Sequence, residues 1–343
     1  MKKKVMVGNI TLGDGNIYIQ SMLNIPASDT ENSVKQAVEL EKAGCRIIRA
    51  AIPTLDDVKL IAALKEKLNI PVVADIHFDY RIALEAAAAG VDKIRINPGN
   101  IGSSDRVKAV ADACRQRGIP IRIGVNSGSL EKNILEKYGK PVPMAFVESA
   151  LESVKILNRY DFDDIVISIK SSDVKTTIEA YRLLAERCDY PLHLGVTETG
   201  TERMGIIKSA IGIGTLLCDG IGDTIRVSLT APPIEEIKAA KDILRAVGIG
   251  GGVNIVACPT CGRTQIDLIS LANRVEEAVA GIEKNITVAV MGCVVNGPGE
   301  AREADIGIAG GKGEALIFRN GEVIKKVPED KILEELLKEI ETI

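Results

Sequence analysis

Arg46-Ile-Ile-Arg-Ala-Ala-Ile52 and Val72-Val-Ala-Asp-Ile76 are two β-rich runs, and residues 54–67 between them have helical spacing. The helical segment opens with Thr54-Leu-Asp-Asp57, a Thr-x-x-Asp pattern typical of a capped helix start. The same alternation of short β-rich runs and helical stretches extends from the N-terminal region to about residue 247. It predicts an α/β fold.

This part of the chain contains eight β-rich runs, at residues 18–22, 46–52, 72–76, 93–97, 119–125, 164–169, 192–196 and 224–229. Eight runs, each followed by a helical connection, across roughly 250 residues have the size and rhythm of a TIM (β/α)8 barrel. A doubly wound open sheet is the main alternative. The length and the number of runs favour the barrel.

The run Gly248-Ile-Gly-Gly-Gly252 is the most flexible-looking stretch and predicts a domain boundary. We therefore expect a barrel over 1–247, a linker over 248–252 and a small α+β domain over 253–343. In the second domain we expect strands at 253–257 and 287–291, a helix at 268–284, a hairpin around Asn320-Gly321 and a charged final helix. Residues 5–18 predict a Gly-Asp-Gly hairpin that plugs the barrel floor.

Composition excludes several classes of protein. The chain is 46% apolar and 26% charged, with a net charge of −4, which is typical of a globular protein without a basic surface for nucleic acid or anionic membranes. No apolar segment suits a signal peptide or a membrane span, so we expect a cytoplasmic protein. Seven cysteines, an odd number, argue against a disulfide framework. Four are scattered singly and are expected to be ordinary buried thiols: Cys45, Cys114, Cys188 and Cys218.

Polar or charged side chains stand at nearly every strand end, where a TIM barrel forms its active site. They are Gln20, Ser21, Arg49, Asp75, His77, Arg95, Asn97, Arg122, Asn126, Lys170, His193, Glu198, Arg226 and Ser228.

The arginines in this set are flanked by apolar β-formers, as in Ile94-Arg-Ile96 and Ile225-Arg-Val227. A closed barrel has no edge and is covered by helices, so these side chains are expected to point inward. Any one arginine could instead pair with a neighbouring helix. Several unpaired buried cations would be prohibitive, so the whole set predicts a polyanionic substrate, most simply a diphosphate.

Three cysteines form a second candidate site, because Cys258-Pro-Thr-Cys261 is followed by Cys293 with no later cysteine or histidine. Three thiolates suit a [4Fe–4S] cluster with one special iron, and Glu300 is the candidate for a ligand other than cysteine. A zinc site or free thiols remain alternatives.

The chain resembles the 4-hydroxy-3-methylbut-2-en-1-yl diphosphate synthase family over essentially its whole length. The resemblance rests on Gln20-Ser-Met22, Arg95-Ile-Asn-Pro-Gly-Asn100, Arg122-Ile-Gly-Val-Asn126, His193-Leu-Gly-Val-Thr-Glu198, Gly222-Asp-Thr-Ile-Arg-Val-Ser-Leu-Thr230, Cys258-Pro-Thr-Cys-Gly-Arg263 and Met291-Gly-Cys-Val-Val-Asn-Gly-Pro-Gly-Glu300.

The resemblance implies the compact two-domain bacterial form. It also implies reductive opening and dehydration of 2-C-methyl-D-erythritol 2,4-cyclodiphosphate in the non-mevalonate pathway, with flavodoxin or ferredoxin as electron donor. A homodimer with a shared active site is implied too. The implied ligands of the [4Fe–4S] cluster are Cys258, Cys261, Cys293 and Glu300.

Roles for the barrel residues follow as expectations. Glu198 is expected to deliver a proton to the departing hydroxyl, with Asp75, His77 and Asn126 as orienting partners. The expected substrate-binding residues are Arg49, Arg95, Asn97, Arg122, Lys170, His193, Arg226 and Ser228. A phosphate-binding barrel with structural zinc and a cluster-based nucleic-acid sensor are the rival functions.

Overall fold

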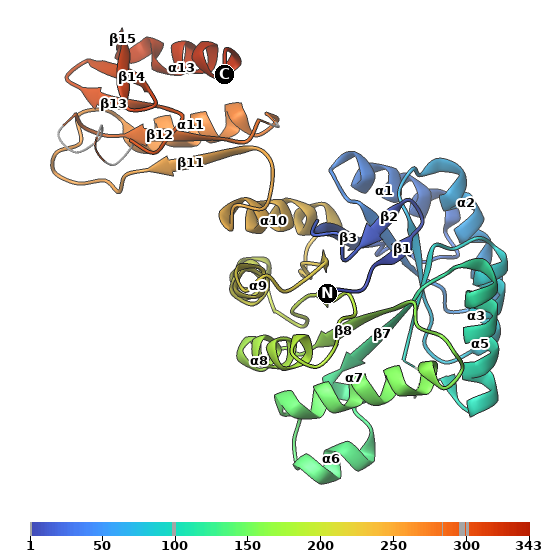
Figure 1. Ribbon diagram of the computed structural model, residues 1–343. Helices are drawn as coiled ribbons and strands as arrows, with labels where there is room; N and C mark the ends of the chain where they lie inside the picture. Colours follow the sequence, from blue (N-terminus) through green and yellow to red (C-terminus); the bar gives the residue numbers. More distant parts are fainter. Residues whose placement is uncertain (1, 98–100, 283, 295–298, 300–301) are drawn as a thin grey trace. The chain divides into compact units, whose positions relative to one another are not determined.

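The computed structural model describes residues 2–97, 101–282, 284–294, 299 and 302–343. The chain divides into two compact units, Met1–Val247 and Gly248–Ile343 (Figure 1). Each unit has its own hydrophobic core.

The first unit is the predicted TIM barrel. Its sheet has eight parallel strands in the order β8-β7-β6-β5-β4-β3-β10-β9. A parallel bridge between Ile167 of β8 and Leu192, directly before β9, links the two ends of this sheet. The strands are β3 (Tyr18–Met22), β4 (Ile47–Ala51), β5 (Val72–Asp75), β6 (Lys93–Ile96), β7 (Ile121–Asn126), β8 (Ile165–Lys170), β9 (His193–Leu194) and β10 (Thr224–Ile225).

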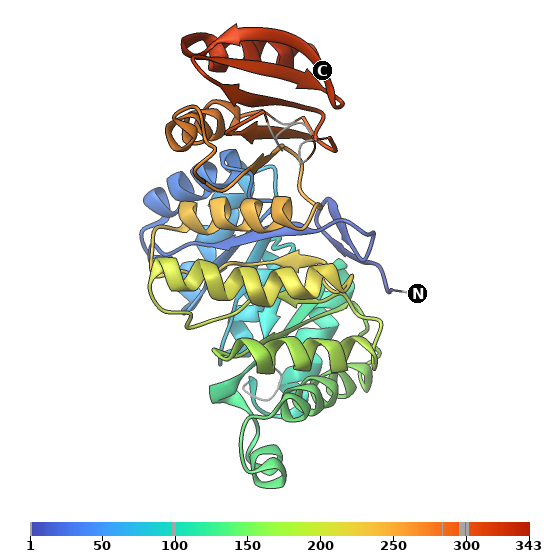
Figure 2. The same cartoon turned by 90° about the vertical axis from the view of Figure 1, so that its left-hand side faces the viewer.

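Helices surround this sheet on the outside (Figures 1 and 2). They bury the apolar outer face of the strands, so that only the inner face is available for polar side chains. The helical elements are α1 (Thr30–Lys42), η1 (Leu55–Val58), α2 (Lys59–Lys67), α3 (Tyr80–Ala88), α5 (Ser104–Arg117), η2 (Ser127–Ser129), α6 (Lys132–Tyr138), α7 (Pro143–Asn158), α8 (Val174–Ala185), α9 (Glu202–Cys218) and α10 (Pro233–Ala246).

The predicted capped start before residues 55–67 is confirmed. The Asp57 carboxylate accepts hydrogen bonds from the Thr54 backbone N–H at 3.1 Å and from its hydroxyl at 2.5 Å. The segment begins as the 3-10 helix η1 and continues as α2.

Strands β9 and β10 are shorter than the β-rich runs at 192–196 and 224–229. Pairing nevertheless continues beyond their ends, because the Arg226 N–H donates to the Leu194 carbonyl at 2.9 Å. The side-chain alternation therefore extends far enough to set the direction of Arg226.

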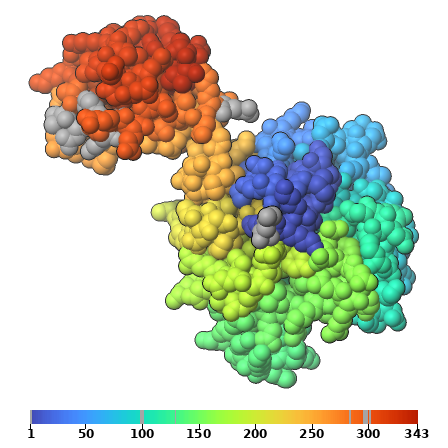
Figure 3. Space-filling view, viewed as in Figure 1, coloured from blue at the N-terminus to red at the C-terminus, as the bar shows by residue number. Residues whose placement is uncertain are grey.

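An N-terminal hairpin, β1 (Val5–Val7) and β2 (Ile10–Leu12), closes the barrel floor. Its apolar side chains form one buried cluster with Ile47, Val73 and Val166, which lie near the starts of β4, β5 and β8. In Figure 3 the N-terminal residues form a continuous dark blue patch on the barrel unit. The predicted plug is confirmed, but its turn lies at Gly8-Asn9 rather than at Gly13-Asp-Gly15.

The second unit is an α+β fold around a five-stranded sheet of order β11-β12-β13-β14-β15, in which the first two pairings are parallel and the last two antiparallel. Asn320 and Gly321, with φ of 50° and 82°, form the predicted hairpin turn. Its elements are β11 (Val253–Ala257), α11 (Leu268–Val279), β12 (Ile286–Met291), β13 (Ile306–Gly311), β14 (Glu314–Arg319), β15 (Glu322–Pro328), η3 (Glu329–Lys331) and α13 (Ile332–Glu341).

Strand β13 was not expected from the sequence. Its glycines, which suggest a loop, permit close packing instead. A Cβ on Gly307 would lie 2.5 Å from the Phe318 ring, and one on Gly310 would lie 2.7 Å from the Ile266 side chain.

Candidate active site

The cationic side chains predicted at the strand ends are buried in the barrel. Arg49, Arg95 and Arg122 are 4%, 4% and 0% exposed, and Lys170 and Arg226 are half-buried. Burial lowers the pKa of Lys170, and the positive charges of Arg49, Arg122 and Arg226 lower it further. These three arginines come from β4, β7 and the segment after β10, so the side chains face one shared interior space.

Asp75 organises two of these arginines. Its carboxylate is 1% exposed and accepts a hydrogen bond from Arg49 Nη2 at 2.5 Å and another from Arg95 Nη1 at 3.3 Å. Burial alone would raise the pKa of Asp75, but the charges of Arg49 and Arg95 outweigh it and lower the pKa below its ordinary value. Asp75 is therefore a fixed anion that orients guanidinium groups.

Many buried N–H groups in this interior have no hydrogen-bond partner within the described residues. Arg122 is the clearest case, because its Nε, Nη1 and Nη2 are all buried without a hydrogen bond. Nε and Nη1 of Arg49 are in the same state. Since buried donors cost free energy unless they are satisfied, these atoms indicate a site shaped for an acceptor-rich ligand.

Two residues of this interior were missed from the sequence. Lys93 begins β6, and its fully buried Nζ has no partner in the described part of the chain. It stands two residues before Arg95, so the same two-residue alternation predicts its direction.

Glu236, the second missed residue, lies on α10. Its Oε1 accepts from the Leu229 N–H at 3.1 Å, and its Oε2 lies 3.6 Å from Arg226 Nε. It shares a helical face with the buried Ala240 and Ile243, at spacings of four and seven residues, which was the available signal.

His193 is fully inside the barrel. Its Nδ1 lies 2.7 Å from Thr224 Oγ1 on the neighbouring strand. Burial lowers the pKa of His193 well below its ordinary value, and the charges of Arg122 and Lys170 lower it further. The imidazole is therefore neutral. Of the remaining predicted binding residues, Asn97 is 4% exposed and Ser228 is half-buried.

The predicted proton-handling residues stand where the strands end. His77, half-exposed after β5, has its Nε2 3.7 Å from Asp75 Oδ2. Asn126 is the half-buried last residue of β7. Glu198 is exposed in the loop after β9 and has a left-handed φ of 55°, which is unusual for a residue other than glycine.

In the second unit, two of the three predicted cysteine ligands lie at the carboxyl ends of neighbouring parallel strands. Cys258 follows β11 and Cys293 follows shortly after β12. The Cys258 N–H donates to the Val290 carbonyl at 3.3 Å, and the Gly292 N–H donates to Cys258 Sγ at 3.2 Å. The two loops are therefore in direct contact.

Cys261 is exposed, and a backbone hydrogen bond at Arg263 lowers the pKa of its thiol. Glu300 lies outside the described residues. In the ranges that the structure describes, no three His, Cys, Asp or Glu side chains are grouped as metal ligands. The thiols and the Gly292 N–H nevertheless have the donor chemistry that suits an iron–sulfur cluster.

The remaining cysteines differ in exposure. Cys45 and Cys114 are buried as expected, and burial raises the pKa of their thiols to about 11 and about 12. Cys188 is only partly buried and Cys218 is exposed, which corrects the expectation for these two. Both lie at or beyond the ends of outer helices rather than within a strand.

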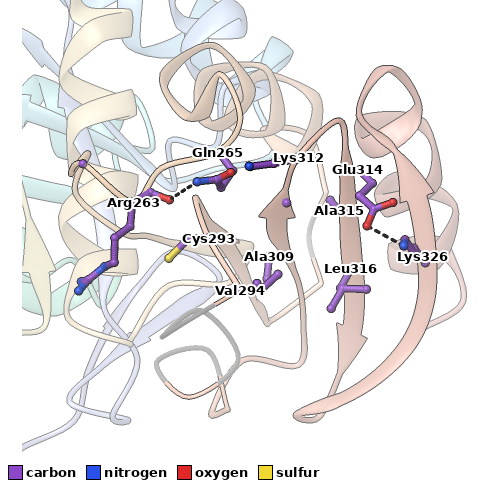
Figure 4. A pocket seen from close by; sticks show the side chains of 12 residues that line it. Arg263, Gln265, Cys293, Val294, Ala309, Lys312, Glu314, Ala315, Leu316 and Lys326 are labelled. Atoms are coloured by element: carbon purple, nitrogen blue, oxygen red, sulfur yellow. Dashed lines mark hydrogen bonds and ion pairs between the residues drawn. The ribbon is translucent and has the colours of Figure 1, made fainter.

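A cavity of about 670 Å³ opens beside Cys293. Figure 4 shows Cys293 among Arg263, Gln265, Val294 and Ala309. The cavity brings one cysteine, cationic side chains and an apolar sheet face together within the second unit.

In the described residues there is no helix both long enough and apolar enough to cross a membrane.

The sequence matches two family domains in succession. The GcpE TIM-barrel domain matches residues 2–241, and the GcpE protein C-terminal domain matches residues 254–342.

Curated relatives match over almost the whole chain. A protein of Clostridium perfringens is 63% identical over 343 residues, covering 99% of this chain and 98% of its own length. Proteins of Clostridium acetobutylicum and Fusobacterium nucleatum are each 57% identical, covering 99% and 98% of this chain and 98% and 96% of their own lengths. All three are named 4-hydroxy-3-methylbut-2-en-1-yl diphosphate synthase (flavodoxin).

Solved structures share the barrel. The dihydropteroate synthase of Yersinia pestis superposes with a TM-score of 0.53 at 15% identity, covering 72% of this chain and 98% of that one. At this identity the similarity concerns the fold alone.

Proposed function

The chain belongs to the GcpE family, and from this premise we propose how its two units carry out the family's reaction. The protein is an iron–sulfur oxidoreductase of the non-mevalonate isoprenoid pathway. It reductively opens and dehydrates 2-C-methyl-D-erythritol 2,4-cyclodiphosphate to 4-hydroxy-3-methylbut-2-enyl diphosphate.

The excess of basic over acidic side chains in the barrel interior is the observation that carries the proposal for the binding site. Among the described residues, two buried carboxylates pair with the strand-end basic side chains, Asp75 with Arg49 and Arg95 and Glu236 with Arg226. Six buried or half-buried basic side chains stand against them: Arg49, Lys93, Arg95, Arg122, Lys170 and Arg226. A diphosphate supplies the missing negative charge and many acceptor oxygens, and guanidinium groups can bind it bidentately.

Binding would position the substrate without much rearrangement of the protein. Asp75 already fixes Arg49 and Arg95, while Glu236 lies beside Arg226. The donors left unpartnered on Arg49 and Arg122 are available for phosphoryl oxygens. Asn97, Lys170, His193 and Ser228 complete the proposed binding residues. Such preorganisation lowers the entropic cost of reaching the reactive geometry.

Glu198 is the proposed proton donor to the departing hydroxyl. Its exposed carboxyl lies in the loop after β9, on a strained backbone of the kind often found at functional sites. Asp75, His77 and Asn126 are the proposed orienting partners.

The proposed cofactor is a [4Fe–4S] cluster held by Cys258, Cys261, Cys293 and Glu300. When bound, it supplies the two electrons of the reaction one at a time. The adjoining Cys258 and Cys293 loops support this assignment, as does the hydrogen bond from the Gly292 N–H to the Cys258 sulfur.

The unit assignments follow from these sites. We assign substrate binding to the barrel over 1–247, a linker to 248–252 and the cluster to 253–343. Flavodoxin, which appears in the names of the relatives, is the proposed electron donor, with ferredoxin as the alternative. We also propose that the protein forms a homodimer with a shared active site. A cytoplasmic location is favoured because the reaction needs reduced thiolates.

Anaerobic turnover of the cyclodiphosphate tests the function. Protein reconstituted with iron and sulfide, and supplied with a chemical reductant, should form the linear diphosphate. A Cys258→Ser variant should bind the substrate but form little product, whereas Cys218→Ser, on the exposed side of the barrel, should match the unmodified protein. Iron-replete protein that leaves the cyclodiphosphate unchanged would exclude the function.

A further inference from the structure

Lys93 is a buried basic residue that is absent from the expected set of substrate-binding residues. It is 0% exposed, and its Nζ has no hydrogen-bond partner among the described residues. It precedes Arg95 by two residues on β6, so it faces the barrel interior about 7 Å earlier along the strand, on the floor side of Arg95.

Arg122 is its cationic neighbour on the adjacent strand. Strands β6 and β7 pair in parallel, with Arg95 opposite Arg122. Lys93 lies two residues before Arg95 and on the same face of β6. Arg122 is also 0% exposed and all three of its guanidinium nitrogens are unpartnered within the described chain.

No described carboxylate forms a hydrogen bond or ion pair with Lys93 or Arg122. Asp75 is hydrogen-bonded to Arg49 and Arg95, and Glu236 is paired with Arg226. Burial lowers the pKa of Lys93, and the charges of Arg122 and Arg49 lower it further. A buried positive charge in this position becomes favourable only when an anion approaches it.

The reaction itself increases the negative charge of the bound diphosphate. The cyclic diphosphate carries two negative charges, and two electrons with one proton convert it to a linear diphosphate with three, plus one water. The ring carbon–oxygen bond breaks with its electron pair on the phosphoryl oxygen, and the hydroxyl leaves as water with the added proton. The electrons come from a donor of the flavodoxin or ferredoxin class.

We propose that Lys93, together with Arg122, stabilises the negative charge that the diphosphate gains as the ring opens. This inference rests on the proposed function. An interaction that strengthens as charge develops lowers the activation barrier, whereas one that is equal before and after only strengthens binding. Lys93 should therefore contribute more to kcat than to KM, and more to binding of the linear than of the cyclic diphosphate.

The test compares Lys93→Met, which keeps the length and apolar stem but removes the charge, with Lys175→Met on the exposed surface of α8. On the iron-replete full chain, kcat of Lys93→Met should fall on the order of 100-fold. KM should change little. Titration calorimetry should show a larger loss of affinity for inorganic diphosphate than for the cyclic substrate. Lys175→Met should match the unmodified protein in all three measurements, and Lys93→Arg should recover part of kcat.

Three results would overturn the inference. One is a folded Lys93→Met variant with unchanged kcat and diphosphate affinity. Another is an equal loss of affinity for both ligands. The third is loss of the fold in both Lys93→Met and Lys93→Leu, which would make Lys93 a structural element of the barrel. Failure of the unmodified protein to bind or convert the cyclodiphosphate would instead refute the proposed function.

Discussion

At the scale of single residues, Asp75 allows arginines to be held close together inside the barrel. Its two carboxylate oxygens accept from Arg49 and Arg95, which would otherwise repel each other in an interior that contains few anions. Asp75 holds Arg49 and Arg95 in place before any ligand binds. Their electrostatic repulsion is therefore already offset in the folded protein.

Asp75→Asn should destabilise the protein by about 3–5 kcal/mol, because it leaves two buried guanidinium groups without their anion. Urea unfolding at pH 7 measures this change. Asp112→Asn, which breaks surface ion pairs with Lys108 and Arg115, is the matched control and should have little effect. A loss for Asp75→Asn no larger than that of the control would contradict the role.

The stabilisation by Asp75 should depend on pH in one direction. Its pKa is lower in the folded protein than the ordinary value of 3.8, so its contribution is complete above about pH 5 and disappears as pH falls through the lower, folded pKa. The stability difference between unmodified protein and Asp75→Asn should therefore shrink in acid below pH 4. A stability difference that grows on acidification would contradict a lowered pKa of Asp75 in the folded protein.

Glu198→Gln should lower kcat by about 10²–10⁴-fold, because an amide cannot donate the carboxyl proton. Iron content and substrate affinity should be unchanged. Glu202→Gln, exposed in the first turn of α9, provides the control. Turnover that survives Glu198→Gln would assign proton delivery to another group.

At the scale of elements, the second unit depends on a strand with little side-chain volume. Gly307 and Gly310 let β13 lie against Phe318 and Ile266, so this part of the sheet is held by close packing of backbone against large side chains. The cysteine-bearing loops leave the same sheet, from β11 and β12. The geometry of those loops therefore depends on an intact central sheet.

Gly307→Ala should destabilise the second unit by about 1–3 kcal/mol, because the added Cβ would lie 2.5 Å from Phe318 and 2.6 Å from the Ala289 carbonyl. Calorimetry of the full chain should show a lower unfolding temperature for this unit and an unchanged transition for the barrel. Gly281→Ala, whose Cβ would meet no atom within 4 Å, is the control. Equal effects of both substitutions would contradict the packing argument.

At the scale of the whole molecule, a chain with a net charge of −4 gathers six buried or half-buried basic side chains inside one barrel. A net negative charge does not favour nucleic acid, whereas a basic interior suits small anions. Charge distribution, rather than charge total, thus sets the class of ligand.

Inorganic diphosphate should stabilise the barrel selectively. At 100 times its Kd, a ligand that binds only the folded state adds about 2.7 kcal/mol. Calorimetry should show the barrel transition rising on addition of diphosphate. The response should be the same in protein whose iron has been removed by a chelator, because the binding residues lie in the barrel. An unchanged barrel transition would argue against diphosphate binding by the basic side chains of the barrel.

The sequence by itself determined the barrel, the hairpin plug, the inward-pointing arginines and the paired cysteine motifs. These features follow from local periodicity: two-residue alternation fixes which face a side chain occupies, and strand–helix repetition fixes the topology. Cys218 was misjudged because apolar neighbours in sequence do not establish burial on a helix surface.

Only the tertiary structure decided which charges meet. The Asp75 bridge joins three neighbouring strands, Glu236 reaches Arg226 from a helix, and Lys93 lacks a partner in the described chain because no carboxylate from another element faces it. Such pairings join residues far apart in sequence and depend on strand register and barrel closure. Local periodicity sets the direction of a side chain, whereas the energy of a buried charge depends on what the rest of the fold places beside it.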